Sequence, residues 1–259
     1  MQGPAGRKGM SGNDAATASI PKSRQTQPQI ASWRHLAGFF LITVCVLSFG
    51  LFAQHAHVAS STGVSGRQLA PHSQAMHLYL IAILMDCALL YYCWAGVHGR
   101  GGSLATLSGG RWTSWKSVAA DLCIALPFWV LWEGTAYGAG RLMGPSNAKS
   151  VYSLLPKNDL EILIWVAVSI TAGVCEEMVF RGYVQRQFHA LTGSVAFAVL
   201  AQALLFGLFH SYQGLKNVAV ITVLGVLYGA LAAWRRNVRI NIVTHAWSDI
   251  WEGWLKFLV

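Results

Sequence analysis

Charged residues are scarce in this sequence, and their scarcity excludes an ordinary water-soluble domain. Only 11% of the 259 residues are Asp, Glu, Lys or Arg, whereas soluble globular proteins carry about a quarter. Hydrophobic residues make up 54% of the chain, and the mean hydropathy is +0.43. This composition indicates a protein that lies in a membrane.

Repetitive and disulfide-rich architectures are excluded as well. The chain has 7 prolines, its 26 glycines follow no fixed period, and no segment repeats another, so collagen-like, proline-rich and solenoid folds do not apply. The cysteines lack the paired spacing of zinc sites and disulfide frameworks. All of them lie in apolar stretches, where we expect them to act as small structural residues: Cys45, Cys87, Cys93, Cys123 and Cys175.

Long apolar runs are what the sequence has in abundance. A helix of about 20 mostly apolar residues crosses the roughly 30 Å hydrocarbon core of a bilayer. Seven stretches meet this description, with the fifth and sixth short enough to leave tilt or re-entry open: Trp33–Ala53, Met76–Val97, Ala119–Gly140, Leu160–Phe180, Ser194–Ser211, Val218–Trp234 and Ile240–Leu258. The sequence therefore predicts an all-α, polytopic transmembrane helix bundle with about seven spans.

The chain divides into three parts on this basis. Residues 1–32 are rich in Gly, Ser, Gln and Ala without hydrophobic periodicity, which predicts a disordered basic tail. Residues 33–150 hold three transmembrane helices and their loops, and residues 151–259 hold the remaining helices with the polar motifs described below. The first apolar run is too long for the core of a cleaved signal peptide, so we expect an uncleaved anchor, with cleavage near Ala53–Ala56 as the alternative.

The net charge of +9 is explained by topology. Most of the 19 Lys and Arg residues fall in the N-terminal tail and in the loops on the same side of the predicted spans. The positive-inside rule then predicts a multi-pass protein with a cytoplasmic N-terminus and a C-terminus on the opposite side. We expect the basic loops to contact anionic lipid, and we expect no nucleic-acid partner.

Acidic residues, although only ten in number, fall mainly inside or at the edges of the predicted spans. Ionisable groups there are costly, tend to face a protein interior or a wet cavity, and often mark function. Glu176 and Glu177 stand out because they are adjacent at the end of a mostly apolar run. For Asp121 and Glu252 a position at the membrane interface is an alternative, and Asp86 and Glu133 could be hydrogen-bonding groups between helices.

Glu176, Glu177 and Arg181 form the most informative motif. On a helix, Glu177 and Arg181 are four residues apart, with the acid before the base, which is the favourable order for an ion pair. Glu176 points about 100° away. The spacing therefore predicts one carboxylate held by Arg181 and a second, less compensated one that is a candidate general base.

Two histidines and an aspartate on later apolar helices complete the set of candidates. His245 and Asp249 share a helix face, so the carboxylate could orient the imidazole or act with it on one atom. If the fourth and fifth helices form a hairpin near Leu191–Ser194, His210 and Glu176 lie at similar depth. The depth of His210 relative to His245 stays open: either the fifth helix is displaced inward, or the polar stretch 211–214 lines a wet cavity in the membrane.

These three motifs, in this order, resemble the CAAX protease and bacteriocin-processing family (CPBP, also called Abi), which is related to the Ras-converting CAAX endopeptidase. The family pattern is Glu-Glu-x-x-x-Arg, then Phe-x-x-x-His, then His-x-x-x-Asn or Asp. This chain has Glu176, Glu177 and Arg181, then Phe206 and His210, then His245 and Asp249. The resemblance covers the chain from about Leu160 to the C-terminus.

The resemblance implies an intramembrane endopeptidase that hydrolyses a peptide bond with a water molecule. Glu176 would be the general base, His210 would position the water or stabilise the oxyanion, and His245 and Asp249 would complete the site. Glu177 and Arg181 would hold the first carboxylate in place. The implied partner is a peptide or protein substrate presented at or in the membrane, and the sequence does not distinguish a prenylated CAAX tail from other peptides.

Metal dependence and the alternatives from other classes stay open at this point. His210, His245 and Asp249 are acceptable zinc ligands, but the sequence lacks the compact His-Glu-x-x-His helix, and the family contains members described as metalloproteases and members described as glutamic-type. We favour the metal-independent hypothesis slightly. The alternatives are a non-catalytic membrane scaffold or immunity protein, a transporter that uses buried carboxylates, and a lipid-modifying enzyme.

Overall fold

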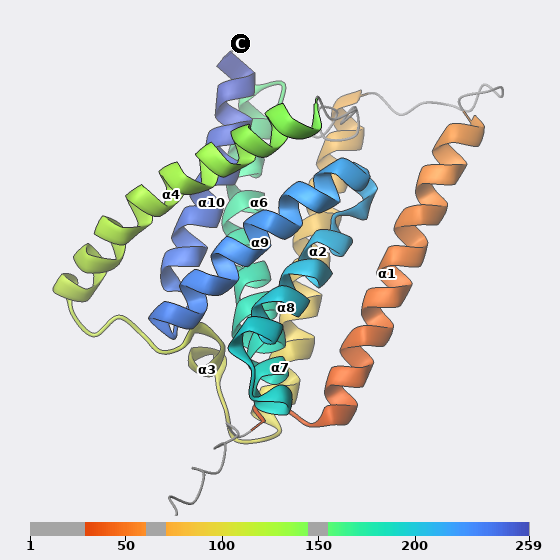
Figure 1. Ribbon diagram of the computed structural model, residues 1–259. Helices are drawn as coiled ribbons and strands as arrows, with labels where there is room; N and C mark the ends of the chain where they lie inside the picture. The colour runs from red at the N-terminus through yellow and green to blue at the C-terminus, as the bar shows by residue number, and fades with distance from the viewer. Residues whose placement is uncertain (1–28, 61–70, 145–154, 259) are drawn as a thin grey trace, which may run out of the picture.

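The chain folds into a bundle of helices (Figure 1). The computed structural model describes residues 29–60, 71–144 and 155–258, and in these ranges every regular element is a helix. The predicted all-α fold class is confirmed. The elements are α1 (Trp33–Ser60), α2 (Pro71–His98), α3 (Leu104–Ser108), α4 (Trp115–Met143), α6 (Asp159–Glu176), the π-helix η1 (Glu177–Val184), α7 (Gln185–Thr192), α8 (Val195–Phe209), the 3₁₀-helix η2 (Ser211–Gln213), α9 (Leu215–Arg235) and α10 (Arg239–Leu258).

Each predicted span coincides with one of these helices. In the described part of the chain, four helical segments are long and apolar enough to cross a membrane: Ala75–His98, Trp115–Met143, Asp159–Thr192 and Leu215–Arg235. Two shorter apolar helices, Trp33–Ser48 and Val195–Phe209, accompany them, as does α10. The prediction of about seven spans is compatible with this arrangement, and the protein is a multi-pass membrane protein.

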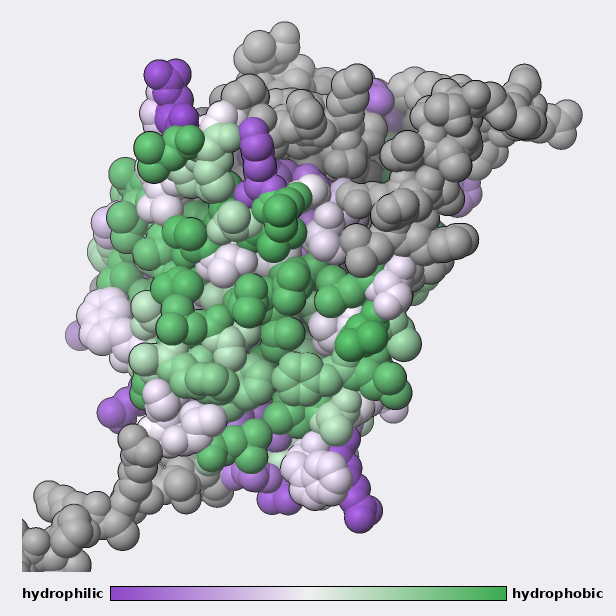
Figure 2. Space-filling view, turned by 45° about the vertical axis from the view of Figure 1, so that its right-hand side comes forward, coloured by the Kyte–Doolittle hydropathy of each residue, from purple (hydrophilic) through white to green (hydrophobic). Residues whose placement is uncertain are grey.

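The outer surface has the polarity that a lipid environment requires. Figure 2 shows a broad band of hydrophobic side chains over the middle of the molecule, with hydrophilic side chains toward its two ends. Large apolar side chains on several helices are more than half exposed, which is common only where lipid replaces water: Leu41, Leu84, Leu126, Leu163 and Leu200. The start of α1 and the end of α10 lie at opposite ends of the bundle (Figure 1).

The long helical segment formed by α6, η1 and α7 occupies the centre of the bundle. α6 packs against α2 and α10, while α8 packs against α9 and contacts η1 and α7. Gly173 allows α6 and α10 to approach closely, because a Cβ atom there would lie 2.8 Å from the backbone nitrogen of Ala246. Small residues serve this purpose at helix contacts in membranes, where van der Waals packing drives association.

The reversal between α7 and α8 occurs at the predicted hairpin turn. Gly193 ends α7 in the left-handed conformation, with φ of 66°, which suits glycine because it has no Cβ. Ser194 then caps α8, since its side chain accepts a hydrogen bond from the backbone N–H of Phe197. α8 thus folds back along α7 and η1, the segment that follows Glu176.

The segment before α1 is tied to the hairpin by one glutamine. The side chain of Gln187 accepts hydrogen bonds from the backbone N–H groups of Ile30 and Ala31 and donates one to the carbonyl of Ala31. The end of the predicted disordered tail, residues 29–32, is therefore part of the fold. Residues 1–28 of that tail lie outside the described residues.

Candidate active site

Glu177 is the buried centre of the site. It is inaccessible to solvent, and its carboxylate accepts hydrogen bonds from Arg181 Nη1 at 2.8 Å and from Asn241 Nδ2 at 3.2 Å. The ring nitrogen Nδ1 of His245 lies 2.9 Å from Glu177 Oε1. The predicted ion pair between Glu177 and Arg181 is therefore present, and Glu177 ties η1 to α10.

The cation of the pair is enclosed as completely as the anion. The guanidinium carbon of Arg181 lies 4.2 Å from the centre of the Phe206 ring and 5.2 Å from that of Tyr228. Cation–π contacts of this kind contribute most where the cation is desolvated. Because Arg181 also donates weakly to the carbonyl of Gly225 at 3.5 Å, α8 and α9 pack around a charge pair that belongs to η1.

The backbone that carries the pair is a π-helix. Residues Glu177–Val184 form η1, whereas the sequence predicted an uninterrupted α-helix, and nothing in its local pattern signals the difference. π-helical turns are rare, and they are frequent at functional sites. The Glu177–Arg181 contact survives the change because both side chains converge on the same interior space.

His245 is held so that its second nitrogen meets two further carboxylates. Its ring stacks on Tyr228, with 5.7 Å between the centroids and 27° between the planes. While Nδ1 is bound to Glu177, Nε2 lies 3.8 Å from Glu176 Oε2 and 3.7 Å from Asp249 Oδ2. The predicted shared face of His245 and Asp249 is present, and Glu176 faces the same nitrogen.

Glu176 differs from its neighbour because its buried oxygen accepts no hydrogen bond from the described residues. Its side chain is 18% exposed, and its Oε2 atom is buried with no hydrogen-bond partner among the residues that the structure describes. A buried carboxylate oxygen without a donor is costly. The atom is therefore free to accept a proton or a hydrogen bond from a bound molecule.

His210 lies at the C-terminal end of α8. Its Nδ1 lies 2.9 Å from the carbonyl oxygen of Phe206, and its ring centroid lies 4.9 Å from that of Phe206. His245 contacts the same phenyl ring at 6.2 Å, so the two histidines lie at similar depth. The reason is that α8 is short and the chain turns through η2 directly after His210. In the described part of the chain, no direct hydrogen bond or ion pair joins His210 to the carboxylates.

Two residues of the site were missed by sequence reasoning. Asn241 is fully buried and donates both to Glu177 and to the carbonyl of Tyr228, at 2.8 Å. It precedes His245 by four residues, so the spacing Asn-x-x-x-His-x-x-x-Asp would have placed it on the same face. Tyr228 lies on α9, and no spacing to a motif residue in the sequence linked it to the site.

The four other acidic residues inside or at the edges of the predicted spans have different surroundings. Asp121 takes part in an ion-pair network with Arg235 and Arg239 at one end of the bundle. On α2, Asp86 is close enough to Glu176, His245 and Asp249 to interact with them electrostatically. Glu252 interacts electrostatically with Asp249, and Glu133, on α4, interacts with Trp129 and Glu252.

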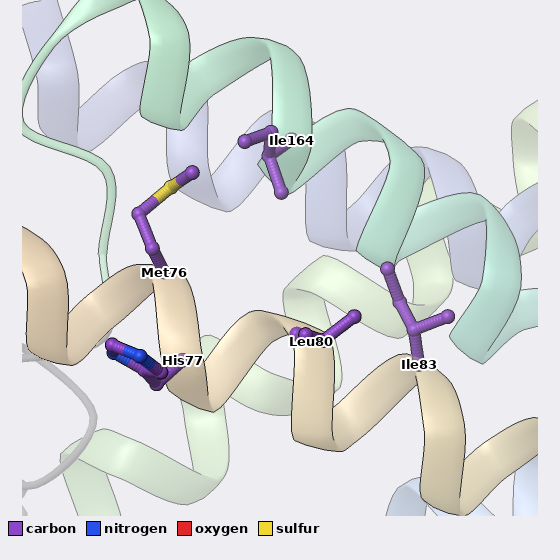
Figure 3. Close-up of a pocket in the computed structure, with 5 residues that line it drawn as sticks. All are labelled: Met76, His77, Leu80, Ile83 and Ile164. Atoms are coloured by element: carbon purple, nitrogen blue, oxygen red, sulfur yellow. The ribbon is translucent and has the colours of Figure 1, made fainter.

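An apolar groove follows the seam between α2 and α6. It has a volume of about 460 Å³ and is lined by Met76, His77, Leu80, Ile83 and Ile164. Met76 and Ile83 extend from α2 toward α6, and Ile164 extends back toward α2 (Figure 3). Because Asp86 follows Ile83 by less than one helical turn, the groove and the polar cluster share one seam.

The side chains as placed do not fit a metal ion. Among the described residues, no group of three or more His, Cys, Asp or Glu side chains is arranged to hold one. Zinc requires several ligand atoms converging at about 2.0–2.3 Å, and the contacts of His245 Nδ1 with Glu177 and of His210 Nδ1 with a backbone carbonyl leave Nε2 of each ring as the possible ligand. In the described part of the chain, the predicted metal candidates His210, His245 and Asp249 do not form a group of the kind that holds a metal.

Comparison with known families identifies the region that carries the site. Residues 158–251 match the family model described as type II CAAX prenyl endopeptidase Rce1-like. The matched segment contains every predicted site residue, from Glu176 to Asp249, and excludes α1, α2 and α4. No curated protein and no solved structure matches the chain.

Proposed function

Because residues 158–251 match the Rce1-like family model of CAAX endopeptidases, we propose that this protein cleaves a peptide bond within the membrane with a water activated by Glu176. One observation carries the proposal. His245 is fixed through Nδ1 by the buried Glu177, and its Nε2 faces the carboxylates of Glu176 and Asp249 at 3.8 and 3.7 Å. The substrate is a peptide or protein at the membrane.

The first step is attack by water on the scissile carbonyl carbon. Glu176 Oε2 has no hydrogen-bond partner in the described residues, so it accepts the proton of the water as the new C–O bond forms. His210 donates through Nδ1 to the Phe206 carbonyl, which leaves Nε2 of the neutral ring as an acceptor. His210 therefore positions the water by accepting its second hydrogen bond.

The second step is collapse of the tetrahedral intermediate. In its protonated form His245 presents an N–H group at Nε2, and the nearby carboxylate of Asp249 balances its charge, which supports a role in stabilising the oxyanion. When the C–N bond breaks, the proton held by Glu176 passes to the leaving nitrogen. Asp249 orients His245 from the next helical turn, and Arg181 keeps Glu177 ionised and in place.

The steps above need only protein side chains and water. Since the candidate ligands form no metal-holding group in the described part of the chain, we propose a metal-independent, glutamic-type reaction. Apolar walls formed by Phe206 and Tyr228 limit the access of bulk water, and in such surroundings the electrostatic effects of Glu176 and His245 are stronger than in water.

A cleavage assay tests the proposal directly. Detergent-purified protein would be given quenched-fluorescence peptides, including a CAAX tail with and without an isoprenoid group, in parallel for wild type, Glu176→Gln and Glu133→Gln. Glu133 is a matched control, because it is a glutamate inside a span and away from the site. We expect cleavage by wild type and by the control, and a loss of about a hundredfold or more in Glu176→Gln.

The same assay distinguishes the alternatives. Cleavage that persists in Glu176→Gln would overturn the assignment of the general base. If folded wild type cleaves no peptide, either in detergent or after reconstitution in lipid vesicles, the proposed protease function is wrong and a scaffold or transporter is favoured. Monodispersity and melting temperature of each variant in detergent establish that it is folded.

A further inference from the structure

Asp86 is an ionisable residue in the middle of an apolar helix that lies outside the family match. It is half-buried in α2, within the candidate span Ala75–His98. A carboxylate at such a position is expensive unless it serves a partner. Its immediate neighbours on α2, from Leu84 to Ala88, offer it no basic group.

The packing of α2 along α6 brings Asp86 to Glu176. The rings of Tyr79 and Trp165 meet edge to face, with 5.7 Å between their centroids. Farther along the same seam, the thiols of Cys87 and Cys175 are close enough to interact. Asp86 directly precedes Cys87 and Glu176 directly follows Cys175, so the register of the two helices places the two carboxylates in one neighbourhood.

Trp165 also fixes α10 against this seam. Its Nε1 donates to the backbone carbonyl of Asp249 at 2.8 Å. The indole fits because residue 253 is glycine: a Cβ atom there would lie 2.2 Å from Trp165 Nε1. One side chain thus sets both the α2–α6 and the α6–α10 contacts, and with them the relative places of Asp86 and Asp249.

Once Asp86 is included, acidic side chains outnumber basic ones around His245. Glu177 and Arg181 neutralise each other, and the carboxylates that Nε2 of His245 faces directly are Glu176 and Asp249. Asp86 interacts with His245 electrostatically from α2. A protonated imidazole at position 245 is attracted by each ionised carboxylate, and more strongly in apolar surroundings than in water.

We propose that Asp86 is a positioning residue of the proteolytic site, contributed by the N-terminal part of the chain, whose negative charge attracts the protonated imidazole of His245 and so holds that ring in its working arrangement beside Glu176. This inference rests on the proposed function and extends its site beyond the matched segment. It also gives α2 a role in the reaction besides completing the bundle.

The test compares Asp86→Asn, which keeps the size and removes the charge, with Asp86→Glu, which keeps the charge and changes the size. Peptide cleavage by the full-length protein would be measured as kcat and KM. We expect Asp86→Asn to lower kcat by about tenfold to a hundredfold, with KM changed by less than about twofold, and Asp86→Glu to recover much of the activity. Glu133→Gln on α4 is the matched control and should leave both constants unchanged.

Each outcome decides one question. If Asp86→Asn equals wild type while Glu176→Gln is inactive, the role of Asp86 is wrong and the proposed function stands. If Asp86→Asn is active and Asp86→Glu is not, Asp86 is a packing group, which also overturns the inference. Should Asp86→Asn fail to fold, Asp86→Ser also removes the charge, in a smaller side chain. Its kcat then decides the role of Asp86 in the same way. Loss of the Glu176 requirement would overturn the proposed function itself.

Discussion

Asp121 and Glu177 are both buried carboxylates held by arginine, and the difference between their surroundings separates a structural network from a reactive one. Asp121 accepts hydrogen bonds from Arg235 at 2.9 Å, from Arg239 at 3.0 Å and from the indole of Trp112 at 2.9 Å. This cluster has more positive than negative charge, and every member points at one carboxylate. It fastens α4 to the junction of α9 and α10.

The Glu177 cluster has the opposite balance. Arg181 neutralises Glu177, but Glu176 and Asp249 stand beside the same histidine without a basic residue of their own. Buried charge that is fully compensated stabilises the arrangement of helices. Buried charge left over, as at Glu176, costs stability and is typical of sites that do chemistry.

The largest expected effect follows from removing the cation of the Glu177 pair. Arg181→Met would leave Glu177 ionised and buried without its partner, which costs about 3–5 kcal/mol. We expect poor yield, a strongly lowered melting temperature and no cleavage. Thermal unfolding in detergent measures the first effect. A stable, active Arg181→Met protein would show that the pair is dispensable.

Next in size is the effect of replacing the histidine between the carboxylates. Gln at position 245 can still donate a hydrogen bond to Glu177 but cannot carry a positive charge. His245→Gln should therefore lower kcat by about a hundredfold or more and change the melting temperature little. A large drop in melting temperature with normal kcat would assign His245 to the fold instead.

The cluster of Asp121, Arg235 and Arg239 should respond in the opposite way, with a loss of stability and an unchanged kcat. Asp121→Asn removes the charge that Arg235 and Arg239 share, and we expect a loss of about 1–3 kcal/mol in the free energy of unfolding. The kcat of the folded fraction should stay at the wild-type value, since Asp121 contacts no site residue. A fall in kcat at unchanged stability would break the distinction between the two clusters.

The smallest expected effect is that of chelation. Because the candidate ligands form no metal-holding group among the described residues, cleavage should be unchanged after incubation with a strong chelator and removal of the chelator. Metal analysis of the purified protein provides the matching measurement. Stoichiometric zinc, whose removal abolishes turnover and whose return restores it, would overturn the metal-independent mechanism.

Local pattern was enough to predict much of this molecule. Apolar runs long enough to cross a bilayer specified the main helices, because backbone groups in lipid must be satisfied within the helix. The four-residue spacing specified the Glu177–Arg181 pair and the shared face of His245 and Asp249, because such neighbours meet on any helix. These features depend on residues close together in the chain.

Contacts between distant helices were decided by tertiary packing alone. The π-helical turn at η1, the meeting of His210 and His245 at Phe206, and the enclosure of Arg181 by Tyr228 arise from which helices pack together and at what depth. Asp86 belongs to the same class, since only the register of α2 against α6 brings it to Glu176. The sequence by itself determined the helices and the reactive residue types, and the packing of apolar surfaces in three dimensions determined which of those residues face one another.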